Sequence, residues 1–204
     1  MSSAPPILAE VVEVPPGFQP AGRAPAPPPL DLVQDFVNTE ISVWAVDDIA
    51  TPDALADWLR SRDLLLDGAL VDAGSFVRAR ALRRVLRALA GRNAHGSSSD
   101  DDLRVEFATV AFNMPLRFEL GEGAGLRFAP ADGGVSGALA EILSRVFEAQ
   151  TSGEWRRLKS CPGPHCGWIF YDASRNASSR WCSMSICGNR TKTAAYRQRR
   201  RTET

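Results

Sequence analysis

The sequence contains no hydrophobic run long enough to cross a membrane. Its longest apolar stretches, residues 64–66 and 68–71, are followed by Asp67 and Asp72, whereas a membrane helix needs about 20 consecutive apolar residues. The first residues also lack the basic start and apolar run of a secretory signal. We therefore expect a cytoplasmic protein, in a compartment that keeps cysteine thiols reduced.

Histidine and catalytic motifs are scarce. The chain has two histidines, His95 and His165. No nucleophile motif, phosphate-binding loop or metal-site carboxylate cluster accompanies them. The sequence therefore predicts that this protein is not an enzyme.

A net charge is also lacking, because 24 basic side chains balance 24 acidic ones. The two kinds are unevenly placed, however. Residues 1–154 contain no cysteine and carry 13 basic and 22 acidic side chains, whereas residues 155–204 hold all four cysteines with 11 basic and two acidic side chains. Because charge and cysteine usage change together, we place a domain boundary near Trp155 and expect separate cores on its two sides.

Nine of the 14 prolines lie within residues 1–29. Proline donates no backbone hydrogen bond, so we expect an extended, mostly disordered tail over residues 1–29. The 44% of hydrophobic residues in the chain as a whole excludes uniform disorder. The folded part should therefore begin at about residue 30.

Residues 30–154 have the apolar spacing of a mainly helical domain. Helices are expected from about Leu30, from Pro52 after the N-cap Thr51, and over residues 76–89. A flexible loop over residues 91–99, a short helix capped by Ser99 and a last helix over residues 139–147 should follow. Residues 116–120 and 126–129 flank a glycine-rich turn and predict a β-hairpin. The expected fold class is therefore α+β.

The four cysteines form two Cys-x4-Cys pairs separated by 15 residues: Cys161 with Cys166, and Cys182 with Cys187. Two such pairs can build a tetrahedral site of four thiolates, which favours one structural zinc ion. Two disulfides, four free thiols, or His165 replacing a cysteine are the alternatives. Such a short module buries little apolar surface, so zinc should supply free energy of folding.

Aromatic residues surround these cysteines. Residues 168–171, which include Trp168 and Phe170, are expected to form a strand with Trp181 as its partner across a turn. The expected module is a β-hairpin followed by a basic C-terminal helix, similar to a treble clef or zinc ribbon.

The segment after Cys187 contains six basic residues and no acid up to residue 201. A basic helix growing from the last zinc loop would complement phosphate groups. DNA is the expected partner, while RNA binding, a protein-interaction adaptor and a solvated basic tail remain alternatives. The candidate nucleic-acid-binding residues are Asn189, Arg190, Lys192, Arg197, Arg199, Arg200 and Arg201.

Polar residues also stand on or near the apolar face of the first expected helix. Asp35 and Asn38 are candidates either for a ligand site or for a polar site within the core. In the second case they would bond locally or pair with basic residues of the long helix: Arg78, Arg83 or Arg84. A small-molecule effector is thus a candidate partner of the helical domain.

The cysteine-rich segment resembles a known family, the CGNR zinc finger, over about residues 158–199. The residues that carry this resemblance are the two cysteine pairs, Trp168, Asp172, Ser174, Asn176, Arg180, Trp181, Gly188, Asn189, Arg190, Lys192, Tyr196 and Arg197. Residues 35–39 resemble the start of a domain that often precedes it, the ABATE-type domain, described as a putative stress-induced transcription regulator.

This resemblance implies a bacterial zinc-binding protein that acts on DNA in transcription regulation and stress response, with RNA binding also proposed for the family. It also implies Cys161, Cys166, Cys182 and Cys187 as the zinc ligands.

Overall fold

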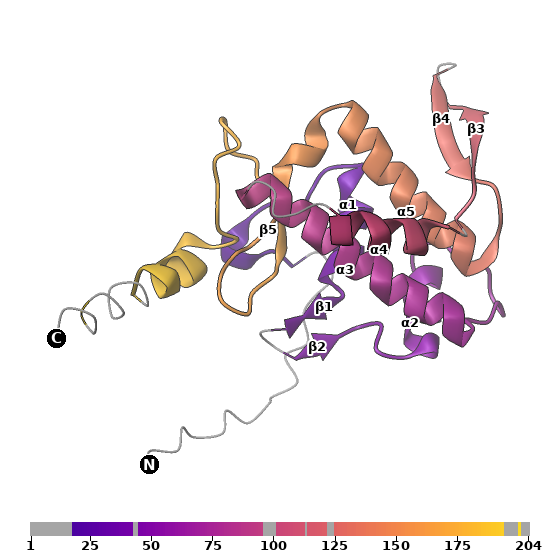
Figure 1. The fold of residues 1–204 in the computed structure, drawn as a ribbon, viewed down its shortest axis with the longest axis horizontal. Helices are drawn as coiled ribbons and strands as arrows, with labels where there is room; N and C mark the ends of the chain where they lie inside the picture. Colours follow the sequence, from indigo (N-terminus) through magenta and orange to yellow (C-terminus); the bar gives the residue numbers. More distant parts are fainter. Residues whose placement is uncertain are drawn as a thin grey trace, which may run out of the picture.

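The computed structural model describes residues 18–42, 45–95, 101–112, 114–121, 125–193 and 200. Three helices, α1 (Leu30–Asn38), α3 (Ala73–His95) and α5 (Gly134–Thr151), pack on one another at its centre (Figure 1). Two more, α2 (Pro52–Arg60) and α4 (Asp101–Ala111), lie against α3. Fully buried side chains fill the space between the central helices, among them Phe36, Leu82 and Ile142. None of the described helices is both long and apolar enough to span a membrane.

The predicted helix starts near Leu30 and Pro52 are confirmed. The Thr51 hydroxyl accepts a hydrogen bond of 3.1 Å from the backbone N–H of Ala54, so Thr51 caps α2 as expected. Along α1, Val33, Phe36 and Val37 are buried, as their spacing indicates.

Helix α3 continues to His95, so the expected flexible loop over residues 91–99 is wrong for residues 91–95. The Asn93 side chain in this last part donates to the backbone oxygens of Trp155 and Leu158, each at 2.8 Å. These bonds tie the helix end to the chain beyond α5 and offset the low helix propensity of Gly91, about 1 kcal/mol below alanine. Ser99, the expected cap of the next helix, lies outside the described residues.

Three two-stranded antiparallel sheets accompany the helices. The predicted hairpin is confirmed as β3 (Leu116–Leu120) and β4 (Leu126–Pro130), with Phe118 opposite Phe128. A second hairpin, β1 (Glu40–Ile41) and β2 (Val46–Asp47), was not expected from the sequence. Its strands have two residues each, which is too short for a hydrophobic alternation to be visible.

The third sheet lies in the cysteine-rich segment, after a short helix, η4 (Glu154–Arg157). Strand β5 (Leu158–Ser160) pairs with β6 (Ile169–Tyr171), in a register that places Lys159 opposite Phe170. The expected strand over residues 168–171 therefore exists, but its partner is β5. The expectation that Trp181 lies in the partner strand is wrong, because β5 on the N-terminal side of the first cysteine pair already occupies that edge.

The last helix begins at Met184. It starts as one π-helical turn, η5 (Met184–Gly188), and continues as an α-helix to Thr193, beyond which residues 194–199 are not described. This helix lies at one edge of the molecule, on the opposite side from β3 and β4 (Figure 1).

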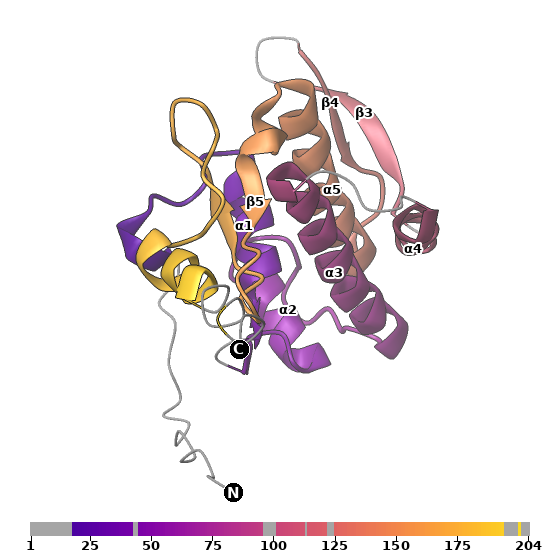
Figure 2. The ribbon, with the colours of Figure 1, turned by 60° about the vertical axis from the view of Figure 1, so that its left-hand side comes forward.

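The two sides of the expected boundary near Trp155 do not have separate cores. Strand β5 lies against α3 in both views of the fold (Figures 1 and 2). Trp155, Leu158 and Ile169 belong to the same buried cluster as the helical side chains. The expectation of separate cores is wrong because the hairpin that begins the cysteine-rich segment also completes the helical core.

The N-terminal tail also differs from the expectation of disorder. Residues 1–17 lie outside the described part, but residues 18–29 are placed and include a short helical turn, η1 (Pro20–Gly22). Gln19 is buried, and its side-chain oxygen accepts hydrogen bonds from Trp168 at 3.1 Å and Gln34 at 3.3 Å. The expectation is wrong for residues 18–29 because tertiary contacts replace the backbone bonds that proline cannot make.

Candidate zinc centre

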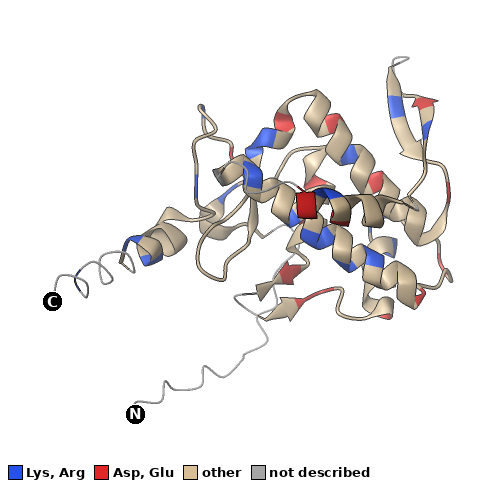
Figure 3. Cartoon of the chain, viewed as in Figure 1, with Lys and Arg blue, Asp and Glu red and all other residues tan. Residues whose placement is uncertain are grey.

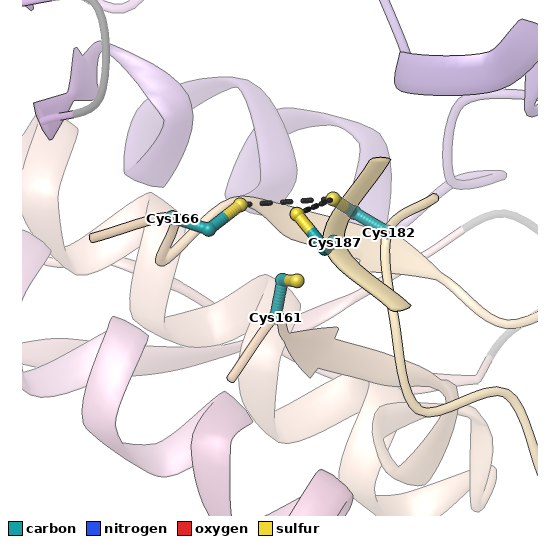
Figure 4. Close-up of side chains that lie close together, drawn as sticks. All are labelled: Cys161, Cys166, Cys182 and Cys187. Atoms are coloured by element: carbon teal, nitrogen blue, oxygen red, sulfur yellow. Dashed lines mark hydrogen bonds between the residues drawn. The ribbon is translucent and has the colours of Figure 1, made fainter. Parts of the chain in front are cut away.

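The four cysteines, far apart in pairs along the chain, converge on one point (Figure 4). All four sulfurs lie within 4.8 Å of one another, and no disulfide joins them. The Cys166–Cys182 and Cys182–Cys187 sulfur separations are 3.6 and 3.7 Å. Zinc–sulfur bonds of about 2.3 Å in a tetrahedron would place the sulfurs about 3.8 Å apart, so the four donors fit one zinc ion.

The first pair lies on the tight connection between β5 and β6. The backbone N–H of Cys161 bonds to the oxygen of Trp168 at 2.9 Å and extends the hairpin pairing by one step. The chain then reverses through a turn in which the Cys166 N–H bonds to the Gly163 oxygen at 2.9 Å. Both sulfurs consequently point to the same side of the hairpin end.

The second pair flanks the start of the last helix. The buried Ser183 side chain accepts from the Ile186 N–H at 3.2 Å, and its backbone oxygen accepts from the N–H groups of Cys187 and Gly188. Cys182 thus precedes the helix and Cys187 lies in its first turn. A metal at these sulfurs would hold the start of the helix against the hairpin.

The charges of the four thiols depend on one another. Hydrogen bonds from Cys166 and Cys182 lower the pKa of the Cys161 thiol, and donating to Cys161 raises the pKa of both neighbours. Burial raises the pKa of Cys187. A divalent cation among the sulfurs would offset part of the charge of four thiolates and displace the remaining protons.

Gly163 shows how tightly the chain wraps this site. A Cβ atom at Gly163 would lie 3.0 Å from the Cys187 sulfur and 3.3 Å from the Cys166 Cβ. Glycine is thus the residue that lets the first loop approach both cysteine pairs.

A small core surrounds the cysteines. Trp168, Phe170 and Ile41 are buried against Cys161, Cys182 and Cys187. Thus β1 of the helical part contributes directly to the packing of the metal site.

The N-terminal segment covers one side of this small core. The Arg23 guanidinium donates to the backbone oxygens of Cys182, at 2.7 Å, and Trp181, at 3.0 Å, and lies over the Phe170 ring. Phe18 packs edge-on against Trp168 with ring centroids 5.8 Å apart. Residues 18–23 therefore help to fix the position of residues 181–182, where the second cysteine pair begins.

A buried ion pair stabilises the segment that connects the two cysteine pairs. Lys159 donates to Asp172 at 2.7 Å, and both side chains are buried. The Asp172 carboxylate also accepts from the backbone N–H groups of Ser174 and Ser179. Burial alone would raise the pKa of Asp172, but the hydrogen bonds from Lys159 and the two serines lower it well below its usual range.

Of the remaining candidates in this segment, His165 is exposed and stands outside the group of metal-donating residues. Asn189, Arg190, Lys192 and Arg200 are exposed. Arg197, Arg199 and Arg201 lie outside the described residues.

Asp35 and Asn38 have different surroundings. The Asn38 amide donates to the Ile169 oxygen and accepts from the Ile169 N–H, each at 2.9 Å, so it joins α1 to β6. Asp35 is half-buried and lies 3.5 Å from Arg62. Burial raises the pKa of Asp35. Among the described residues, neither side chain pairs with Arg78, Arg83 or Arg84; Arg83 instead bonds to Asp47 and Thr39.

Sequence reasoning did not identify Gln34, which is fully buried one helical turn before Asn38. It accepts from the Ala26 N–H at 2.7 Å and donates to the Ile169 oxygen at 3.2 Å. Gln34 and Asn38 are amides four residues apart beside the apolar face of α1, so they lie on the same side of the helix. This spacing was the sequence signal for their shared contact with Ile169.

Comparison with known proteins divides the chain into two matched parts. Residues 30–153 match a family model described as a putative stress-induced transcription regulator, and residues 157–200 match the CGNR zinc finger. No curated protein matches the sequence. The cofactor is accordingly one structural zinc ion at the four-cysteine site. The chain belongs to the family described as putative stress-induced transcription regulators, and it carries a CGNR zinc finger behind that domain.

Proposed function

We propose that this protein is a transcription regulator that docks on duplex DNA through the helix that begins in its zinc site. The observation that carries the proposal is the position of Cys187 in the first turn of this helix, directly before the exposed residues Asn189, Arg190 and Lys192.

The charge around the zinc site supports a polyanionic partner. Asp172 is the one acidic residue among the described residues from Trp155 onward, and it is buried against Lys159. Several basic residues of the same part are exposed: Arg156, Arg175, Arg180, Arg190, Lys192 and Arg200. Basic residues lie on the last helix in Figure 3. Among the described residues of this module the exposed charges therefore have one sign, which attracts phosphate groups.

The geometry of the zinc site supports an ordered docking element rather than a solvated tail. The helix start is bonded to Ser183 and would be held by two of the four zinc–sulfur bonds. Arginine presents a planar fork of donors that suits phosphate oxygens. Asn189 and Arg190, nearest the fixed end, are our candidates for contacts with base edges.

The other basic candidates extend this proposal on the sequence alone. Arg197, Arg199 and Arg201, outside the described residues, follow Arg190 and Lys192 within the same basic segment. We infer that they add phosphate contacts. The role is one of binding, and neither matched family description names an enzymatic activity.

The test measures affinity of the zinc-loaded full chain for one duplex DNA and for RNA of the same sequence, at several salt concentrations. On DNA, each phosphate contact contributes about −0.9 to the slope of log affinity against log salt. Arg190→Ala with Lys192→Ala should make that slope shallower by about one unit, through the lost Lys192 phosphate contact, and should also remove the base-edge contact of Arg190. Arg197, Arg199, Arg200 and Arg201 changed together to alanine should remove most of the remaining affinity.

Arg84→Ala is the matched control, since it removes an exposed arginine from α3 and should leave the slope unchanged. Parental affinity and slope in both multiple variants would overturn the proposal. Tighter binding to RNA than to the duplex would make RNA the ligand instead. No binding to either would favour an adaptor that binds protein.

A further inference from the structure

Strand β3 is the outer strand of its hairpin. Strand β4 lies against α5 and β3 lies beyond it (Figure 2), and no third strand pairs with β3 in the part of the chain that the structure describes. An unpaired strand edge can pair with another chain, and proteins commonly protect such edges with proline, lysine or a bulge. Residues 116–120 contain no proline or lysine and pair with β4 in an unbroken register. This edge is therefore open to a partner strand.

The hairpin register decides which backbone groups point to the open edge. The Gly121 N–H bonds to the Gly125 oxygen at 2.7 Å, at the end of the β3–β4 pairing. Bonding alternates along an antiparallel strand, so Arg117 and Glu119 direct their backbone N–H and C=O groups to β4. The residues that direct these groups to the open edge are Leu116, Phe118 and Leu120.

Large apolar side chains are exposed beside this edge. Phe118 is 70% exposed and Leu120 is 73% exposed. Phe118 lies opposite Phe128 on the same face of the hairpin, with ring centroids 4.8 Å apart, and Phe128 packs edge-on against Phe147 of α5. Helix α5 thus covers the face of β4 at Phe128 but leaves the apolar side chains of β3 largely in contact with water.

The sequence of β3, Leu-Arg-Phe-Glu-Leu, is complementary to itself. When two copies pair antiparallel with Phe118 opposite Phe118, Leu116 is opposite Leu120 and Arg117 is opposite Glu119. The residues that point to the open edge then form the hydrogen-bonded pairs, and the charged residues occupy the pairs whose side chains are closer. A shift by two residues in either direction would place Arg117 opposite Arg117 or Glu119 opposite Glu119, which is unfavourable. The charges of β3 therefore select one register.

We propose that two copies of this chain form a twofold dimer by antiparallel pairing of β3 with β3, so that the two hairpins become one continuous sheet. The two Phe118 rings meet on its apolar face. On the other face, the Glu119 carboxylate already binds Arg117 and Arg127 of its own chain, and Arg117 of the second copy extends this ion cluster. Association through β3 is independent of nucleic-acid binding, because the last helix lies on the opposite side of the molecule (Figure 1).

Analytical ultracentrifugation of the zinc-loaded full chain tests this dimer. We expect a molar mass of about 44 kDa, twice the 22.1 kDa of one chain. Phe118→Lys should reduce the mass to that of a monomer, because two like charges would then face each other across the twofold axis. Leu70→Lys is the control and should keep the dimer, since it changes a side chain between α2 and α3 that is 89% exposed.

Reversing the charges tests the register. Arg117→Glu and Glu119→Arg should each give a monomer, because like charges then face each other in every cross-strand charged pair. A mixture of the two variants should form a heterodimer, and both changes in one chain should restore the homodimer. Association in the mixture requires both variants to be folded, so a folding defect cannot imitate this result.

Three results would overturn the proposed dimer. One is a parental chain that stays monomeric at about 0.1 mM. Another is a dimer that persists in Phe118→Lys. The third is a mixture of the two charge variants that shows no heterodimer.

Discussion

Single polar side chains on α1 join the helical part to the zinc module. Asn38 uses both halves of its amide on the backbone of Ile169 and so acts like a neighbouring strand at one residue of β6. Gln34 donates to the same backbone oxygen one turn earlier. The half-buried Asp35 between them has only a long contact to Arg62. We therefore expect Asn38 and Gln34 to contribute more to the free energy of unfolding than Asp35 does.

We predict that Asn38→Ala lowers the free energy of unfolding by roughly 1–3 kcal/mol, because it leaves the buried N–H of Ile169 without its acceptor, while the Ile169 oxygen keeps only the bond from Gln34. Asp35→Ala should cost less than about 1 kcal/mol, as expected for a partly exposed ion pair. Urea unfolding of both variants compares them directly. Equal losses in the two variants would contradict this account of α1.

Gly163 gives a second test at the scale of one residue. Gly163→Ala should weaken zinc binding, because the added methyl group would lie 3.0 Å from the Cys187 sulfur. Competition with a chromophoric chelator measures the change. Gly125→Ala, where a Cβ meets nothing within 4 Å, is the control and should bind zinc as the parent does. An unchanged affinity of the Gly163 variant would mean that the two cysteine loops are less closely packed.

Among the elements, those with a local signal could be predicted from the sequence. Helices α1 and α2 and the β3–β4 hairpin have apolar periodicity, a capping threonine or a glycine-rich turn, and the cysteine spacing by itself indicated the metal site. The end of α3 could not be predicted, because Asn93 finds its partners more than 60 residues later in the chain. The same holds for the partner of β6 and for residues 18–29, whose order depends on Trp168, Gln34 and Cys182.

Two arginines of α3 bind the β1–β2 hairpin: Arg87 binds Glu40 of β1, and the buried Arg83 binds Asp47 of β2. The Arg83 guanidinium forms two hydrogen bonds to Asp47, of 2.6 and 3.0 Å, and its side chain is only 1% exposed. Burial would raise the pKa of Asp47, but Arg83 outweighs this effect and lowers it. The stability from this pair is thus present above the ordinary carboxyl pKa of 3.8 and is lost as the pH falls through the lower, folded-state pKa.

Asp47→Asn should therefore lower the free energy of unfolding by roughly 2–3 kcal/mol at neutral pH, since it leaves a buried guanidinium without its main acceptor. The difference from the parent should be full above about pH 5 and should shrink as the pH falls below about 4. Unfolding curves of both proteins across this range measure that difference, in which acid effects common to the two cancel. A difference that is constant with pH would contradict the role given to Asp47.

In the whole molecule, each of the two matched parts contributes side chains to the buried cluster of the other. Sequence composition changes sharply near Trp155, yet Leu158 and Ile169 pack among the helical side chains and Ile41 packs among the cysteines. The composition reflects surface charge and metal ligands, which do not reveal where buried side chains go. Loss of zinc should accordingly disturb the helical part as well as the residues after Trp155.

The central claim is that the four cysteines hold one zinc ion, and native mass spectrometry of the purified full chain tests it most directly. We predict one zinc ion per chain, retained through gel filtration and lost when any one of Cys161, Cys166, Cys182 or Cys187 is replaced by serine. A parental chain that carries no metal and has the mass expected for two disulfide bonds would contradict the account.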